Sequence, residues 1–465
     1  MDVSSPSAQS VDPAGIARFL DGLERDPRVE PHGLIIQRHG RRIAEGYWAP
    51  HTGDHRRLVY SLSKTFTGTA LALQLGEGRL TLDDLVSDHL PALFDGADPA
   101  TRRLQIRHIA SMATGHDRET LAEALAIDPE DPVRGFLQIP LDAEPGSLFA
   151  YNQPPVLALA TILQDLAGER LVDYLRPRVL DPLGITDLRW AQVRPGLDMG
   201  FSGVHTNLDA IARLGQLYLD DGVWDGHRLL PEGWVADASS VQIANPQREE
   251  PDWRQGYGFQ LWMARHGYRG DGAFGQYMVV LPEHDTVVAM FSCIEDMQVV
   301  LDLMWEHLLP ALAGAAAPPS ASSPADEALA ARLAGLTLPT AAERLGGGPP
   351  DVAATTFAPV ATGPSHRTVT SIEVAGRRMV VHEGDESMEV PLTPGWTVAG
   401  PSLAASAATL DDGRLVVDLA FLAHPHRLEI DLDPSAGTFV ARWPTVPLFG
   451  AGADRRLASM HPPTD

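Results

Sequence analysis

The hydrophobic residues near the start of the chain recur first with a helical period and then with the shorter period of strands. Residues 12–26 predict a helix because four apolar side chains fall on one face: Ile16, Phe19, Leu20 and Leu23. Residues 33–40 and 41–48 predict two strands joined by a turn at Gly40.

Helical periods dominate the next part of the chain, and strands return after it. Residues 61–78, 156–168 and 207–222 predict helices, with loops rich in Pro and Gly between them. Residues 276–292 predict strands, and a last helix is expected over residues 297–314. Terminal helices that flank strands, with a helical insertion between them, predict one α/β unit whose two ends meet.

The pattern changes again after residue 313. Residues 314–328 are rich in Ala, Pro and Ser and predict a linker. Beyond it, alternating apolar and polar residues predict strands over 368–374, 378–383, 387–392, 414–422, 426–432 and 438–443. We therefore expect a first domain over residues 1–313 and a small antiparallel barrel or sandwich over 329–465.

Composition and charge narrow the class of protein. The 465 residues carry a net charge of -25, which argues against a nucleic acid or an anionic membrane as the partner. Cys293 is the only cysteine, so no disulfide can form within the chain. The first residues lack a basic start and an apolar run, so we expect no signal peptide and a cytoplasmic location. No segment has the roughly 20 consecutive apolar residues of a membrane span.

The use of lysine is unusual. Lys and Arg together number 36, and Lys64 is the only lysine among them. Arginine at nearly every cationic position indicates a bias against lysine, so Lys64 marks a position where arginine does not serve. A guanidinium keeps its proton in a protein, whereas a buried amine can lose its proton and act as a base.

Ser61 and Lys64 are three residues apart at the start of a predicted helix, so they share one face of it. A serine hydroxyl becomes a good nucleophile when a nearby base takes its proton, and a desolvated lysine suits that role. Free N–H groups at the helix start can also stabilise an oxyanion. The same spacing fits an N-capping serine followed by a surface lysine, but the single lysine and the apolar flanks favour a catalytic pair.

The segment "YSLSKTFTG" (60–68) resembles the nucleophile motif of the serine β-lactamase and penicillin-binding-protein-like hydrolases. The most similar branch is the class C-like group, which includes esterases, D-aminopeptidases and nylon-oligomer hydrolases. Further segments match the family in order between residues 12 and 312, but the resemblance does not cover 330–465. It implies an α/β (α+β) fold in which terminal helices flank an antiparallel sheet that carries a helical insertion domain. The C-terminal barrel resembles the lipocalin-like domains appended to some of these hydrolases.

The second motif of the family is Tyr-x-Asn, and "PGSLFAYNQPP" (145–155) falls in its place. The resemblance implies that Tyr151 shares proton transfer with Lys64, its phenol being kept acidic by the nearby ammonium. Gln153 stands where the family has asparagine, so its contacts to Lys64 or to substrate can differ. Asn152 is expected to substitute for it in part. Whether Lys64 or Tyr151 is the principal base stays open.

The third motif is a strand with Lys-Thr-Gly or His-x-Gly, and "RGDGAFGQ" (269–276) falls in its place. The resemblance implies that Gly270, Asp271 and Gly272 line the substrate and that the N–H groups of Ser61 and Ala273 form the oxyanion hole. Gly270 thus replaces a cation that in the family commonly meets a substrate carboxylate. Its absence argues against β-lactamase and carboxypeptidase activity and leaves esterase or amidase activity open.

The glycines at 270, 272 and 275 also fit the spacing of a dinucleotide-binding loop. Such a loop must open a helix, whereas these glycines lead into a predicted strand, so we attribute them to a substrate lying against a strand edge. The cations beside them are expected to be solvated: Arg265, His266 and Arg269.

The sequence therefore predicts a serine hydrolase that acts through an acyl-enzyme on a small ester, amide or peptide, without a metal or cofactor. An acyl-transferase or a D-peptidase on the same fold is an alternative. Gln153 and Gly270 depart from the family pattern and motivate a second alternative, a non-catalytic binding or sensor protein. The oligomeric state is not predicted.

Overall fold

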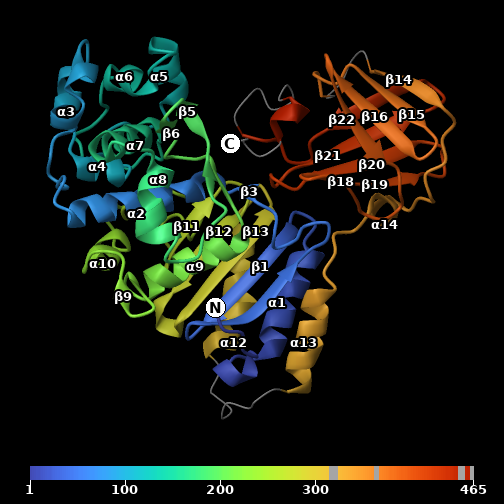
Figure 1. Cartoon of the computed structure of the whole chain (residues 1–465), viewed down its shortest axis with the longest axis horizontal. Coiled ribbons are helices and arrows are strands. Elements are labelled where there is room, and N and C mark those ends of the chain that lie inside the picture. The colour runs from blue at the N-terminus through green and yellow to red at the C-terminus, as the bar shows by residue number, and fades with distance from the viewer. Residues whose placement is uncertain (314–322, 361–365, 449–455, 461–465) are drawn as a thin grey trace.

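The computed structural model describes residues 1–313, 323–360, 366–448 and 456–460. Helices around a central sheet form a first domain, and a β-barrel lies beside it (Figure 1). None of the described helices has both the length and the apolar character that crossing a membrane requires.

A six-stranded sheet forms the centre of the first domain, and each strand is antiparallel to its neighbours. In spatial order its strands are β10 (Trp262–Met263), β11 (Tyr268–Gly272), β12 (Gln276–Leu281), β13 (Thr286–Cys293), β1 (Glu30–Arg38) and β2 (Arg41–Tyr47). Strands from the two ends of the domain meet where β1 pairs with β13. The predicted antiparallel sheet and the predicted meeting of the two ends are confirmed.

Both faces of this sheet are buried, because side chains along each strand alternate in direction. In β1, Leu34 and Ile36 join the core beneath the terminal helices, whereas Ile35 joins the core beneath the helical insertion. The terminal helices on the first face are α1 (Pro13–Arg25), α11 (Gln298–Leu303) and α12 (Leu309–Ala313). Helix α9 (Leu208–Leu219) packs on the other face, against β1, β12 and β13.

The helical insertion runs between β2 and β10. Its helices are α2 (Ser63–Gly76), α3 (Val86–His89), α4 (Ile106–Ala110), α5 (Leu121–Ile127), α6 (Pro132–Leu137), α7 (Gln153–Ala167), α8 (Leu171–Leu175), α9 (Leu208–Leu219) and α10 (Trp234–Ala238). The predicted helices are confirmed as α2, α7 and α9. Helices α2 and α7 pack together and are buried along most of their length, so side chains at their N-terminal ends are held rigidly.

Part of the predicted linker forms a helix in the structure. Residues 314–322 lie outside the described residues, but α13 (Pro324–Ala334) begins inside the predicted linker. Ser323 caps this helix, and α13 packs on α1 and β2 of the first domain (Figure 1). Leu329 and Leu333 complete the core beneath the terminal helices. The first domain therefore recruits residues that the sequence pattern assigned to the linker and to the barrel domain.

The second domain is a nearly closed barrel of nine strands. In spatial order they are β17 (Glu386–Pro391), β16 (Arg378–Glu383), β15 (Ser371–Ala375), β14 (Thr355–Pro359), β22 (Thr438–Arg442), β21 (Arg427–Asp433), β20 (Leu415–Phe421), β19 (Leu403–Thr409) and β18 (Thr397–Gly400). The first strand of this order packs against the last two, which brings the barrel close to closure. Helix α14 (Ala341–Leu345) covers β19.

The six predicted strands of this domain correspond to β15, β16, β17, β20, β21 and β22. The sequence pattern missed β14, β18 and β19. The predicted barrel is thus confirmed in outline, and its likeness to lipocalins stays a prediction.

The packing of α13 yields a stability prediction. Leu333 is buried against β2, where a Cβ at Gly46 would lie 2.9 Å from its side chain, whereas Leu345 on α14 is exposed. Leu333→Ala should lower the free energy of unfolding by about 2–4 kcal/mol through the cavity that it leaves. Leu345→Ala is the matched control and should change little. Guanidinium unfolding followed by tryptophan fluorescence measures both, and equal effects would contradict the packing of α13 on the first domain.

Candidate active site

Ser61 lies in a turn of 3-10 helix, η2 (Tyr60–Leu62), that leads directly into α2. The hydroxyl of Ser63 fixes this turn by donating to the carbonyl oxygen of Tyr60 (2.6 Å) and accepting from the N–H of Val204 (2.9 Å). Tyr60 has a φ of 49°, a left-handed conformation that residues other than glycine adopt at a cost. A strained residue before Ser61 and a fixed turn after it hold its hydroxyl at the N-terminal end of α2.

The structure brings the amine of Lys64 against the hydroxyl of Ser61, with 3.1 Å between Nζ and Oγ. Nζ also donates to Oε1 of Gln153 and to the carbonyl oxygen of Phe201, each at 2.8 Å. Lys64 is 1% exposed, and the three acceptors that the described residues give it are uncharged.

Burial lowers the pKa of Lys64 to about 7, although the charges of Asp271 and Glu119 oppose the shift. An amine with a pKa near neutrality is partly unprotonated and can take a proton from a neighbouring hydroxyl. The pair therefore has the geometry and the electrostatics of an activated serine.

Tyr151 lies just before α7, with its ring stacked on Trp262 at 5.2 Å between centroids. Burial raises the pKa of its phenol, and the charge of Asp271 adds to this effect, which the nearby hydroxyl of Ser61 only partly offsets. The expected acidic phenol is therefore wrong. Nζ of Lys64 lies 4.8 Å from the centre of the Tyr151 ring, where it contacts the ring rather than stabilising a phenolate.

The two amides after Tyr151 point in different directions. Gln153 accepts from Lys64, which is the contact expected of the family's asparagine. Asn152 is buried and its Oδ1 accepts from both the N–H and the hydroxyl of Thr120, each at 3.0 Å. The prediction that Asn152 substitutes for Gln153 and binds substrate is therefore wrong, because its oxygen is used to hold the loop before α5.

The glycines of β11 are required by the nucleophile turn. A Cβ at Gly272 would overlap the carbonyl oxygen of Val59, and a Cβ at Gly270 would overlap the hydroxyl oxygen of Thr65. The expectation that a substrate explains these glycines is wrong, since α2 and the turn before it occupy the space. A dinucleotide-binding loop is also excluded here, because Gly270 and Gly272 lie in β11 and Gly275 lies in the turn to β12.

Ser61, Tyr151, Gln153, Asp271 and Ala273 line one pocket with a volume of about 510 Å³. Its wall also contains aromatic rings and the barrel residue Leu448; the rings are Tyr60, Trp253 and Trp262. Asp271 and Asp296 in the wall are paired with Arg269 and Arg28. Among the described residues of the wall, the other carboxylates still outnumber the single guanidinium of Arg248; they are Glu119, Glu250 and Glu295. The pocket is therefore acidic, as well as lacking the family's cation at Gly270.

The cations beside β11 do not replace the missing charge. Arg269 is fully buried and pairs with Asp271 at 2.9 Å, so the expectation that it is solvated is wrong. Arg265 pairs with Asp252 and Asp302, and the ring of His266 packs on Trp305. None of the three is among the described residues that line the pocket.

Sequence reasoning missed Trp253, Trp262, Glu119 and Arg248 as pocket residues. Trp262 lies in "QGYGFQLWM" (255–263), a segment that already matches the family in order, and this is the signal that could have identified it. The other three lie in loops or at their ends, where neither a period nor a motif marks them.

A serine in the turn before α2 and a lysine in α2, beside the edge of an antiparallel sheet between terminal helices, are features of serine hydrolases. The model of the Beta-lactamase family matches residues 32–308, and the chain belongs to this family of serine hydrolases.

Two relatives of the chain have names that state different functions. The chain is 25% identical over 323 residues to the 6-aminohexanoate-dimer hydrolase of Paenarthrobacter ureafaciens. This alignment covers 63% of this chain and 81% of the relative. The chain is 25% identical over 308 residues to penicillin-binding protein 4 of Amycolatopsis lactamdurans, which covers 57% and 79%.

Solved structures share the fold at lower identity. EstCE1, a hydrolase with promiscuous acyltransferase activity, aligns with a TM-score of 0.51 and 20% identity, covering 63% of this chain and 99% of that one. A penicillin-binding protein homologue from Caulobacter crescentus aligns with a TM-score of 0.52 and 16% identity, covering 67% and 99%.

The contact between β11 and α2 yields a prediction with a built-in rescue. Gly270→Ala should destabilise the protein by about 1–3 kcal/mol, because its Cβ overlaps the hydroxyl of Thr65. Adding Thr65→Ala removes that hydroxyl, which has no hydrogen-bond partner among the described residues, and should restore most of the loss. Thermal and guanidinium unfolding of the two single variants and the double variant measure this coupling. Additive losses would contradict it.

Proposed function

We propose that this protein is a serine hydrolase that cleaves esters or amides through an acyl-enzyme on Ser61. The observation that carries the proposal is the buried amine of Lys64, with a pKa of about 7, at 3.1 Å from the hydroxyl of Ser61. A structural lysine would keep its charge and face water or a carboxylate. This lysine is held by neutral acceptors beside a nucleophile.

In the proposed reaction, Lys64 takes the proton of Ser61 as Oγ attacks the substrate carbonyl carbon. The N–H groups of Ser61 and Ala273 stabilise the oxyanion, and the proton passes to the leaving group as the carbon–leaving-group bond breaks. Water then attacks the acyl carbon and gives a proton to Lys64. As the bond from the acyl carbon to Oγ breaks, Lys64 returns this proton to Oγ, which releases the acid and restores Ser61.

Tyr151 stays protonated in this scheme and is not the base. Its raised pKa keeps the phenol protonated at neutral pH, and it lines the same pocket as Ser61. Lys64, with the lower pKa, is then the principal base. Gln153 orients the amine of Lys64 through its hydrogen bond.

The charge of the pocket indicates the kind of substrate. Carboxylates in its wall repel a substrate carboxylate, and the position that holds a cation in the family is Gly270. Aromatic rings beside the carboxylates suit an ammonium group, which is attracted by both. We therefore propose neutral or cationic esters and amides as substrates. The relative named 6-aminohexanoate-dimer hydrolase acts by its name on a dimer of an amino acid, whose amino end matches this choice and whose carboxylate end does not.

Acyl transfer is the second activity that this site supports, since an alcohol or amine can replace water as the acceptor. EstCE1, with a similar fold, is described as having this activity. A product analysis in the presence of a primary alcohol separates hydrolysis from transfer.

The roles of Ser61 and Lys64 yield a prediction. A fluorophosphonate should label Ser61, and Ser61→Ala should abolish both labelling and the hydrolysis of p-nitrophenyl butyrate. In the wild type kcat/KM should rise with pH through about 7, as the amine of Lys64 loses its proton. Lys64→Arg should lower kcat/KM by about 10²–10⁴-fold, because a guanidinium keeps its proton.

The matched control for Lys64→Arg is Arg25→Lys, an exchange of the same two cations at a side chain that is 79% exposed. It should leave kcat/KM and the pH profile unchanged. Lys64→Arg with activity within tenfold of the wild type would remove the base role, and labelling that persists in Ser61→Ala would remove the nucleophile.

The acidic pocket yields a prediction on substrate charge. Three p-nitrophenyl esters of similar length differ only in the far end of the acyl group: 6-aminohexanoate, hexanoate and adipate. We expect kcat/KM to be about tenfold higher for the cationic ester than for the anionic one, with the gap narrowing as salt is added. A preference for adipate would contradict the proposed substrate class.

A further inference from the structure

The barrel reaches the residues that directly precede Ser61. The N–H of Leu58 donates to the carbonyl oxygen of Ala423 at 2.9 Å. Two residues later, the hydroxyl of Tyr60 lies 2.7 Å from Nε2 of His426, the residue that directly precedes β21. The second domain thus contacts the nucleophile turn itself through backbone and side-chain hydrogen bonds.

The ring of His426 also contacts the far side of the proposed oxyanion hole. Phe274 follows Ala273 directly, and its ring meets the imidazole edge to face at 4.6 Å between centroids. The rings of Tyr60 and Phe274 are 5.3 Å apart and pack in the same way. One imidazole therefore touches the residue before Ser61 and the residue after Ala273.

Both of these neighbours have strained backbones. Tyr60 has a φ of 49° and Phe274 a φ of 66°, in a region that aromatic residues rarely occupy. Such conformations persist only where the surroundings enforce them. Contact with a fixed ring is a direct way to enforce both conformations, and with them the directions of the adjacent N–H groups of Ser61 and Ala273.

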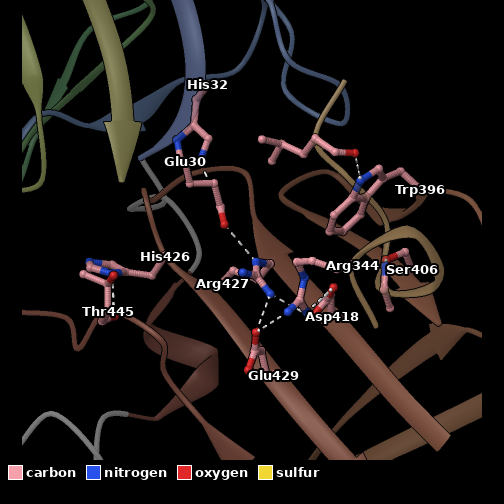
Figure 2. Close-up of polar contacts among 12 residues, drawn as sticks. Glu30, His32, Arg344, Trp396, Ser406, Asp418, His426, Arg427, Glu429 and Thr445 are labelled. Atoms are coloured by element: carbon pink, nitrogen blue, oxygen red, sulfur yellow. Dashed lines mark hydrogen bonds and ion pairs between the residues drawn. The ribbon is translucent and has the colours of Figure 1, made fainter. Parts of the chain in front are cut away.

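His426 is itself held in place within the barrel. It is 1% exposed, and its Nδ1 lies 3.1 Å from the carbonyl oxygen of Thr445 (Figure 2). Because a carbonyl oxygen can only accept, Nδ1 carries a proton, and Nε2 forms the hydrogen bond with the hydroxyl of Tyr60. The ring can therefore neither rotate nor flip without losing a hydrogen bond.

The next residue, Arg427, ties this part of the barrel to the first domain. Its guanidinium bonds Glu30 of β1 at 3.0 Å and, within the barrel, Asp418 at 2.8 Å and Glu429 at 2.9 Å (Figure 2). The side chain of Arg427 is 11% exposed, so these charge-assisted bonds are shielded from water. The barrel is thereby anchored beside His426, and the histidine has a defined position relative to Ser61.

We propose that His426 is a positioning residue for the oxyanion hole, acting through Tyr60 and Phe274. The inference rests on the proposed function, because the N–H groups of Ser61 and Ala273 have an oxyanion to stabilise only if Ser61 forms an acyl-enzyme. Residue 426 lies outside the stretch of the chain that matches the family, residues 32–308. The barrel thus contributes to transition-state stabilisation without touching the substrate through His426.

The test compares Tyr60→Phe, which removes only the hydrogen bond, with His426→Ala, which also removes the ring. Hydrolysis of p-nitrophenyl butyrate gives kcat and KM, and inhibition by phenylboronic acid reports the tetrahedral state that the hole stabilises. We expect kcat to fall about 3–10-fold in Tyr60→Phe and about 10–100-fold in His426→Ala, with KM within about twofold of the wild type. The inhibition constant of the boronic acid should rise by the same factors.

Two further variants make the result specific. His382→Gln removes another barrel histidine, on β16, and should leave all constants unchanged. The double variant Tyr60→Phe/His426→Ala should be no slower than His426→Ala alone, because the hydroxyl then has no imidazole to bind. The apparent pKa in the pH profile should stay at that of the wild type in every variant, since His426 moves no proton in the reaction.

The outcomes separate this inference from the proposed function. Wild-type protein that neither turns over esters nor reacts with a fluorophosphonate at Ser61 would overturn both. A second outcome would overturn the role of His426 alone. In it, Ser61 is labelled in the wild type, but kcat and the boronic acid inhibition constant of both single variants lie within twofold of the wild-type values. A fall in kcat without weaker boronic acid inhibition would overturn it as well. If His426→Ala fails to fold, Tyr60→Phe decides by the same criteria.

Discussion

The burial of one amine is the constraint on which the rest of the first domain depends. Lys64 lies inside a packed interior, with a side-chain amide, a carbonyl oxygen and a serine hydroxyl as its described acceptors. Dipoles can hold such a group only if each is correctly placed, because an unsatisfied buried amine is strongly destabilising. Gln153 at the start of α7, Phe201 in the loop before β7 (Val204–Thr206) and Ser61 before α2 must therefore meet at one point. Because α2 and α7 are buried and closely packed, they help to hold these acceptors at fixed positions around the amine, and this fixed, buried environment lowers its pKa.

Much of this arrangement could be predicted from the sequence, for identifiable reasons. Strands β1 and β13 and the terminal helices repeat with clear periods, because each presents one set of side chains to one core. Ser61 and Lys64 were predicted from their spacing on a helix and from a family motif, and Tyr151 was predicted from a family motif alone. Strand β19 was missed because it is rich in alanine and buried on both faces, which erases the alternation. Helix α13 was missed in part because Ala, Pro and Ser fit both a linker and a capped helix.

The direction of side chains in the site could not be predicted, since it depends on contacts distant in sequence. Asn152 and Gln153 are adjacent amides, yet Asn152 accepts a hydrogen bond from Thr120 and Gln153 accepts one from Lys64. Arg269 looked like a surface cation, but the carbonyl oxygens of Asp252 and Met263 and the carboxylate of Asp271 surround it in the interior. An arginine paired in this way neutralises a buried carboxylate and adds no free positive charge to the pocket. Only the tertiary structure distinguishes these cases.

The order in which the site is assembled follows from where its parts lie in the chain. β1 pairs with β13, so the central sheet is complete only when residue 293 has been made, and the contact from His426 to Tyr60 spans 366 residues. During synthesis the serine and its lysine leave the ribosome long before the barrel does. Contacts of such large sequence separation form late in folding. Under our two proposals, a nascent chain therefore carries its nucleophile in an unfinished setting and gains full reactivity only when the second domain folds.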